Sequence, residues 1–267
     1  MSVGTNAVKD TAKTALKGNW TKVIIVALIP VFTIFICVNI AGLISIPLGQ
    51  VIAILISLIL QFFLTAPVLL GVIRYIWRMM FSADDNPVGV FYLFSSKQLY
   101  FKAIKLSFLI VSKCVFWFSI LNVPTLLLYV LSKNAVFEFL DMQMPLWTVN
   151  LSYVSTFLIN ASVIVVALIT LKYYLAPVLF VADENMEPAE ALHMSTVISK
   201  KSSVDFVYLI FSFLGWILLS LLVMPLVFTM PYMLTAYCVH VRFAVAEYNR
   251  HIKENSNKDF FVFPQNI

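Results

Sequence analysis

The chain has 267 residues, of which 61% are hydrophobic and only 12% are charged, with a formal net charge of +5. Soluble domains carry about 45–50% apolar and about 25% charged residues, so this composition excludes an ordinary soluble enzyme or binding domain. Residues 23–73, 142–171 and 206–241 contain no Lys, Arg, Asp or Glu. Because one membrane span needs about 20 apolar residues, the sequence predicts a polytopic helical membrane protein.

Basic residues are distributed unevenly along the chain and predict its orientation. Sixteen of the eighteen Lys and Arg residues lie in the two terminal segments and in the connections after the second and fourth predicted spans. Cytoplasmic segments are enriched in Lys and Arg, so both termini are predicted to be cytoplasmic. Attraction of these segments to anionic lipid headgroups accounts for the positive net charge of the chain. The lipid bilayer is therefore an expected partner, and nucleic acid is not. We expect an all-α fold of about six transmembrane helices, near residues 22–43, 50–75, 104–130, 150–180, 206–224 and 227–247.

The tetrapeptide Ala-Pro-Val-Leu occurs twice, within residues 64–71 and 174–181. Each copy is followed by an acidic segment that ends in proline, ADDNP at 83–87 and ADENMEP at 182–188. Asp and Asn favour helix N-caps and Pro favours the first helical turn, so both segments predict the start of a new helix. We interpret the prolines of the even-numbered spans as tolerated kinks whose lost hydrogen bond is supplied by neighbouring spans. These prolines are Pro67, Pro177 and Pro231.

The surroundings of the repeat predict three units, each an amphipathic cytoplasmic helix followed by a membrane hairpin. The units run approximately over 1–80, 81–181 and 182–253, with a cytoplasmic tail at 254–267, in a single integral membrane domain. All units enter from the same side, so the repeat is parallel. The expected apolar stripes are Val8, Ala12, Ala15 and Leu16 in the first helix, Phe91, Phe94, Gln98 and Phe101 in the second, and Ala191, Met194 and Ile198 in the third.

Three segments resemble a known bacterial family: AKTALKGNWTKVI at 12–24, YLAPVLFVADENMEPAEALHMS at 174–195, and SFLGWILL with MPY at 212–232. Over nearly its whole length the chain is similar to the uncharacterised family called domain of unknown function 975. It is distantly similar to the membrane domain of glycerophosphodiester phosphodiesterases. One departure is LLVMPLVFT between the last two spans, where the family often has glycines. The resemblance implies a six-span helical protein of the bacterial cytoplasmic membrane and no activity, since the catalytic barrel of those phosphodiesterases is a separate domain.

Two ionisable residues inside predicted spans are candidates for a functional polar site. Lys113 lies in the third span, where a lysine at mid-bilayer costs about 2.5–3.5 kcal/mol on insertion scales. It either snorkels to the headgroups or makes a structural hydrogen bond, or else it contacts a substrate or ion. His240 lies near the cytoplasmic end of the sixth span. It either packs with an interhelical hydrogen bond or carries a proton or ligand.

Other polar residues have simpler structural explanations. Asn122 and Asn160, like Asn39 and Gln61, are predicted to form interhelical hydrogen bonds worth roughly 0.6 kcal/mol each. Helix capping explains the acidic cluster after the fourth span better than a divalent cation does, because the segment supplies no fixed loop geometry; its members are Asp183, Glu184, Glu187 and Glu190. The cysteines are predicted to be small buried hydrophobes, and they are Cys37, Cys114 and Cys238. No metal or cofactor is expected.

The sequence favours a non-enzymatic protein, because it contains neither a catalytic motif nor paired carboxylates at bilayer depth. The expected role is a membrane scaffold or a module that binds lipid, a membrane-protein partner or a second copy of itself. The alternative is a small-molecule or lipid transporter with a cavity near the proline-containing spans. A cavity lined by Lys113, Pro67, Pro177 and Pro231 would favour transport.

Overall fold

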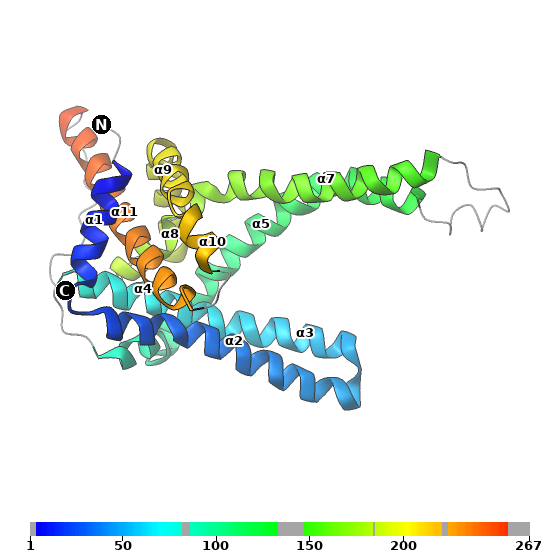
Figure 1. Ribbon diagram of the computed structural model, residues 1–267, viewed down its shortest axis with the longest axis horizontal. Coiled ribbons are helices and arrows are strands. Elements are labelled where there is room, and N and C mark those ends of the chain that lie inside the picture. The colour runs from blue at the N-terminus through cyan, green and yellow to red at the C-terminus, as the bar shows by residue number, and fades with distance from the viewer. Residues whose placement is uncertain (1–3, 82–85, 133–146, 184, 221–223, 256–267) are drawn as a thin grey trace. The chain divides into compact units, whose positions relative to one another are not determined.

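The computed structural model describes residues 4–81, 86–132, 147–183, 185–220 and 224–255, and all regular structure within these ranges is helical (Figure 1). The prediction of an all-α fold is therefore confirmed. The chain divides into two compact units. The larger unit contains residues 1–107 and 173–267, and the smaller unit contains residues 108–172.

Four of the six predicted spans are helical segments long and apolar enough to cross a membrane, in the part of the chain that the structure describes. The predicted fifth span is interrupted, because α9 ends at Phe211 and α10 covers only Leu214–Leu219. The sixth lies within α11 (Leu226–Asn255), which also carries charged residues such as Arg242. The count of six therefore stays a prediction. The four segments are Trp20–Pro47, Gln50–Met80, Lys97–Leu127 and Tyr153–Ala182.

The first hairpin of the larger unit joins α2 (Trp20–Leu48) to α3 (Gln50–Leu60) through Gly49 (Figure 1). Gly49 has a φ of 82°, which glycine adopts readily because it lacks a Cβ. The chain then passes through the π-helical turn η1 (Gln61–Thr65) into α4 (Ala66–Met80). The second span is thus a broken helix whose π-helical turn lies immediately before the first Ala-Pro-Val-Leu.

The core of the larger unit forms around α4. This helix packs against the 3-10 helix η2 (Pro87–Phe94), against α11 and against α8 (Ala176–Ala182), which carries the second Ala-Pro-Val-Leu. The approach to η2 is so close that a Cβ added to Gly71 would lie 1.9 Å from the carbonyl oxygen of Val90. Only glycine fits at such a close backbone approach. The two copies of the repeat therefore meet in one core.

The N-terminal helix α1 (Thr5–Leu16) packs against α11. Lys9 donates to the carbonyl oxygen of Ser212 at 2.8 Å, and its ammonium lies 4.7 Å from the centroid of the Phe213 ring. Because this carbonyl lies at the end of α9, Lys9 caps the break between α9 and α10. Three members of the predicted stripe are buried and one is half-buried: Val8, Ala12 and Leu16, and Ala15.

The two other amphipathic segments differ in how well they follow the prediction. The third begins as predicted, because α9 (Pro188–Phe211) starts at the proline and buries Ala191 and Ile198, with Met194 half-buried. The prediction of one continuous second helix is wrong. There η2 follows the surface of α4 and ends, and α5 (Lys97–Ser132) begins after two serines. The residues of the predicted stripe are all exposed: Phe91, Phe94, Gln98 and Phe101.

The described residues of the smaller unit form two apolar helices, the part of α5 from Phe108 onward and α7 (Trp147–Thr170), which ends at the 3-10 turn η3 (Leu171–Tyr173). The amide nitrogen of Asn122 donates to Ser162 Oγ at 2.8 Å, and Ser162 Oγ lies 3.1 Å from Asn122 Oδ1, to which it donates. The two helices are therefore joined by a polar pair within an apolar contact, the interhelical bond expected of Asn122.

Candidate functional site

The candidate site is built on the two helix breaks at the Ala-Pro-Val-Leu copies. Proline has no N–H, so it cannot donate to the carbonyl four residues earlier in a helix. For Pro67 that carbonyl belongs to Phe63. The hydroxyl of Tyr100, from α5, donates to it at 3.2 Å. A neighbouring helix thus supplies the hydrogen bond that the proline removes, as the sequence predicts.

The break before Pro177 is sealed by two side chains from two different helices. The Ser195 hydroxyl of α9 accepts a hydrogen bond from the backbone N–H of Leu175 at 3.2 Å. The Tyr237 hydroxyl of α11 donates to the backbone carbonyl of Tyr174. Backbone groups buried in apolar surroundings must be paired, so these contacts stabilise the break. They also tie the start of α8 to α9 and α11.

The side chain of Tyr174 extends this arrangement into a polar cluster with Ser202 and His240. Its hydroxyl lies 2.9 Å from Ser202 Oγ, to which it donates, and 3.0 Å from His240 Nε2. Ser202 Oγ in turn donates to the carbonyl of Ile198 at 3.3 Å. These contacts form one chain of hydrogen bonds when His240 carries its proton on Nε2. His240 then donates to the Tyr174 oxygen, Tyr174 donates to Ser202, and Ser202 donates to the backbone.

Aromatic rings cover the polar cluster. The ring of Phe206 stacks on that of Tyr174, with centroids 4.1 Å apart and an angle of 11° between planes. The same ring lies 5.5 Å from the His240 ring and 5.9 Å from that of Tyr237, between centroids. His240 is 1% exposed. The cluster is therefore a buried junction between α8, α9 and α11.

The chemistry that this junction supports follows from which polar atoms are engaged. The Ser202 hydroxyl donates to its own helix, and His240 is covered by aromatic rings, so neither presents a free nucleophile or base to a substrate. A buried hydrogen-bonded network fixes the helices in one packing. For His240, the arrangement favours an interhelical hydrogen bond over a proton or ligand role.

The other predicted polar residues do not join this junction. Lys113 and Asn160 belong to the smaller unit, where both are exposed. Asn160 bonds within its own helix, donating to the carbonyl of Thr156 at 2.9 Å. Asn39 and Gln61 also bond within their own helices, so their prediction as interhelical bonds is wrong. Pro231 lies inside α11 without interrupting it.

The acidic cluster takes part in helix packing at the start of α9. Glu187 is the N-terminal flanking residue of α9, but its side chain does not cap the helix and instead pairs with Lys102 at 3.1 Å and Lys105 at 3.8 Å. Asp183 accepts from the backbone N–H of Asn185 at 3.0 Å. Glu190 lies in the first turn of α9, where the helix dipole favours a carboxylate. Glu184 lies outside the described residues.

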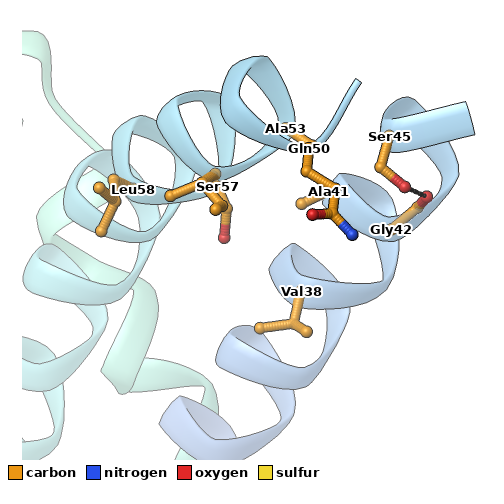
Figure 2. A pocket seen from close by; sticks show the side chains of 9 residues that line it. Val38, Ala41, Gly42, Ser45, Gln50, Ala53, Ser57 and Leu58 are labelled. Atoms are coloured by element: carbon orange, nitrogen blue, oxygen red, sulfur yellow. Dashed lines mark hydrogen bonds between the residues drawn. The ribbon is translucent and has the colours of Figure 1, made fainter. Parts of the chain in front are cut away.

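A groove of about 470 Å³ lies between α2 and α3, near their connection at Gly49. Figure 2 shows the Gln50 side chain in the space between the two helices, with Ala53 and Ser57 farther along α3. The groove is lined by none of Lys113, Pro67, Pro177 and Pro231, so the expected cavity near these residues is not this one. Cys37 and Cys238 are buried as predicted, Cys114 is half-buried, and all three thiols are free.

Sequence reasoning found His240 and the prolines but missed the residues that surround them. The missed residues are Tyr100, Tyr174, Ser195, Ser202, Phe206 and Tyr237. One local signal was available, because Tyr174 carries a hydroxyl three positions before Pro177. The signal is weak, because tyrosines are common at membrane interfaces for other reasons. Among the described residues, no three His, Cys, Asp or Glu side chains are close enough to hold a metal ion.

Comparison with known proteins gives a family and no activity. The model of a family described as a protein of unknown function (DUF975) matches residues 3–245, and the chain belongs to that family. No curated protein and no solved structure matches the chain.

Proposed function

We propose that this member of a family of unknown function is a non-enzymatic membrane protein that acts by binding partners through its outward-facing helix surfaces. The observation that carries the proposal is the junction of Tyr174, Ser202 and His240, whose hydrogen bonds are made to one another and to backbone groups. Polar groups used in this way hold helices together. Because they are already hydrogen-bonded, these groups do not form a nucleophile and base that could act on a substrate.

The outward surfaces support the same proposal. The helices of both hairpins carry many exposed large hydrophobic residues, such as Phe35 and Ile54 on the first hairpin and Phe157 and Ile164 on the second. In a bilayer these surfaces contact lipid or other membrane proteins. The basic N-terminal, C-terminal and connecting segments support a cytoplasmic location for both termini, with six spans in three parallel units in the bacterial plasma membrane. Kinship with the membrane domain of glycerophosphodiester phosphodiesterases is part of this proposal, without hydrolysis.

The alternative, transport, receives less support from the same geometry. Tyr100 bonds the carbonyl of Phe63, which Pro67 leaves without its helical donor, and Ser195 and Tyr237 bond the N–H of Leu175 and the carbonyl of Tyr174 at the break before Pro177. In transporters the groups freed at broken helices coordinate an ion or substrate. Here they are occupied by side chains of the protein, which favours packing over transport.

A matched pair of variants tests the proposal. His240→Gln retains an N–H donor for Tyr174, whereas His240→Leu removes it. We expect His240→Leu to lower the thermal unfolding midpoint and the amount of assembled protein in the membrane, because the buried tyrosine oxygen loses its donor. We expect His240→Gln to recover most of the midpoint and to leave unchanged the set of proteins cross-linked to the full chain in native membranes.

Two results would contradict the proposal. One is a stable His240→Gln protein, at wild-type abundance, that has lost its cross-linked partners. The other is a solute flux into proteoliposomes containing the wild-type chain that exceeds the flux into protein-free vesicles and disappears in His240→Gln. Either result would show that the junction of Tyr174, Ser202 and His240 takes part in the function of the protein and does more than hold the helices together.

A further inference from the structure

The first hairpin carries a proline in each of its two arms, at the same distance from its turn. Pro30 lies inside α2, and Pro67 lies at the start of α4. At about 1.5 Å per residue, Pro30 lies about 28 Å before Gly49 and Pro67 lies about 27 Å after it. The two arms pack side by side from this turn (Figure 1). The two prolines therefore lie at one level of the hairpin.

The same level separates two parts of the hairpin that pack differently. Residues on the core side of the prolines are buried in both arms, namely Val23, Val26 and Ala27 in α2 and Val68, Leu70 and Val72 in α4. Toward Gly49 the large side chains are mostly exposed, such as Phe32 in α2 and Leu55 in α3. α3 packs mainly against α2 and η1. The distal part, residues 31–60, is therefore held mainly by contacts between its own two arms and with η1.

Backbone hydrogen bonds are lost in both arms at this level. Each proline leaves the carbonyl four residues earlier without its helical donor, and these carbonyls belong to Val26 and Phe63. The Tyr100 hydroxyl donates to Phe63, whereas among the described residues no side chain donates to Val26. The π-helical turn η1 adds to the loss, because bonds to the fifth residue leave one more carbonyl without a backbone donor. Helices bend where such bonds are missing.

The side chain of Thr65 shows that η1 leaves a polar group unsatisfied. Thr65 is 7% exposed, and its hydroxyl oxygen is buried with no hydrogen-bond partner among the described residues. A threonine hydroxyl in a regular helix bonds the carbonyl four residues earlier. Six other threonines of this chain do so, and they are Thr11, Thr14, Thr33, Thr170, Thr229 and Thr235. A change of η1 toward an α-helix would give Thr65 the same bond, to Gln61.

We propose that the first hairpin is hinged at the level of Pro30 and Pro67, so that its distal part tilts relative to the core of the larger unit. Bending at this level costs few backbone hydrogen bonds, because the prolines and η1 have already removed them. The turn η1 changes between π-helical and α-helical geometry as the hairpin tilts, and Thr65 gains its bond in the second state. The inference goes beyond the proposed function, which requires the outward surfaces but no motion of them.

The test measures the distribution of distances between two spin labels in the full-length chain in lipid bilayers, by pulsed electron paramagnetic resonance. One pair of labels, on genetically encoded amino acids, joins Val51 in the distal part to Val204 on α9, and both positions are exposed. A second pair joins Val204 to Lys17, which follows α1, and reports the core alone. We expect the first pair to give the broader distribution.

Three variants and a control identify the hinge. Pro30→Ala and Pro67→Ala each restore a backbone donor at the level of the hinge, so each should narrow the distribution of the first pair. Tyr100→Phe removes the side-chain donor to Phe63 and should broaden it. Pro47→Ala is the matched control, because Pro47 lies in the same helix as Pro30 but next to the turn. It should leave the width unchanged.

Each outcome decides the proposal. A broad first distribution that narrows in the two hinge variants and not in Pro47→Ala supports it. A wild type in which both pairs give equally narrow distributions overturns it, and so does a control variant that narrows the distribution as much as the hinge variants do. If the hinge variants fail to assemble, Tyr100→Phe decides, since its hydroxyl lies at an exposed contact: a broader distribution supports the hinge, and an unchanged width overturns it.

Discussion

The two copies of Ala-Pro-Val-Leu fold differently although they share four residues and pack against each other. The first follows a π-helical turn and has one freed carbonyl bonded by Tyr100, in a contact that is exposed. The second follows a 3-10 turn, and its break is sealed by Ser195 and Tyr237 in the core. In both copies the proline removes a backbone donor, whereas the neighbouring side chains determine how the freed backbone groups are paired.

The copies also differ one turn beyond the proline. The first copy has Gly71 there, and the second has Val181, which is buried. The backbone of η2 lies directly against Gly71, so a Cβ at this position has no room. α8 instead packs its side chains against α4 and α9. The same motif thus supports a backbone contact in one copy and a side-chain contact in the other.

The largest expected effect is that of Gly71→Ala. The added Cβ would lie 1.9 Å from a backbone oxygen, so η2 must move away from α4. We expect a loss of about 3 kcal/mol in the free energy of unfolding, measured by denaturant titration in detergent micelles, and reduced assembled protein in the membrane. Gly215→Ala, where nothing lies within 4 Å of the added Cβ, is the control and should be neutral. Equal stability of both variants would show that the close contact with η2 does not hold the core.

An intermediate effect is expected from Tyr237→Phe. This change removes the hydroxyl that donates to the carbonyl of Tyr174 and leaves a buried acceptor unpaired. We expect a loss of about 2 kcal/mol, measured in the same titration. Tyr208→Phe removes an exposed hydroxyl from α9 and should have no measurable effect. If the two variants proved equally stable, the sealing of the second break would be irrelevant to stability.

The smallest effect is expected from Tyr100→Phe. Its hydroxyl donates to the carbonyl of Phe63 at an exposed contact, where a shift of the π-helical turn can re-pair the carbonyl. We expect a loss of about 0.5 kcal/mol, measured as the difference in unfolding midpoint from the wild type. If Tyr100→Phe lost as much stability as Tyr237→Phe, the exposure of the first break would make no difference to the strength of its hydrogen bond.

Much of the fold could be predicted from the sequence because it rests on local signals. Long uncharged runs predicted three of the four spans that the structure describes, and the proline after Glu187 predicted the start of α9. The second amphipathic segment could not be predicted in the same way. Its residues follow the helical period, yet η2 is held in a 3-10 conformation by its contact with α4, which lies elsewhere in the sequence.

The candidate site shows the same division. His240 attracted attention because an ionisable residue is costly in an apolar span. Its partners did not, because Tyr174 and Ser202 are ordinary residues until the tertiary structure brings their hydroxyls within hydrogen-bond distance. Asn122 and Asn160 were indistinguishable by sequence, and only the packing of α5 on α7 turned one inward and left the other outward.

The sequence by itself therefore determined that the chain is helical, that it has helices apolar enough to span a membrane, and that Pro67 and Pro177 each remove a backbone donor inside an apolar run. These properties depend on hydrophobicity and on the missing N–H of proline, both of which belong to the residue itself. The tertiary structure decided which groups satisfy each break and which amide faces outward. Those outcomes depend on residues far apart in the chain, whose contacts no local pattern records.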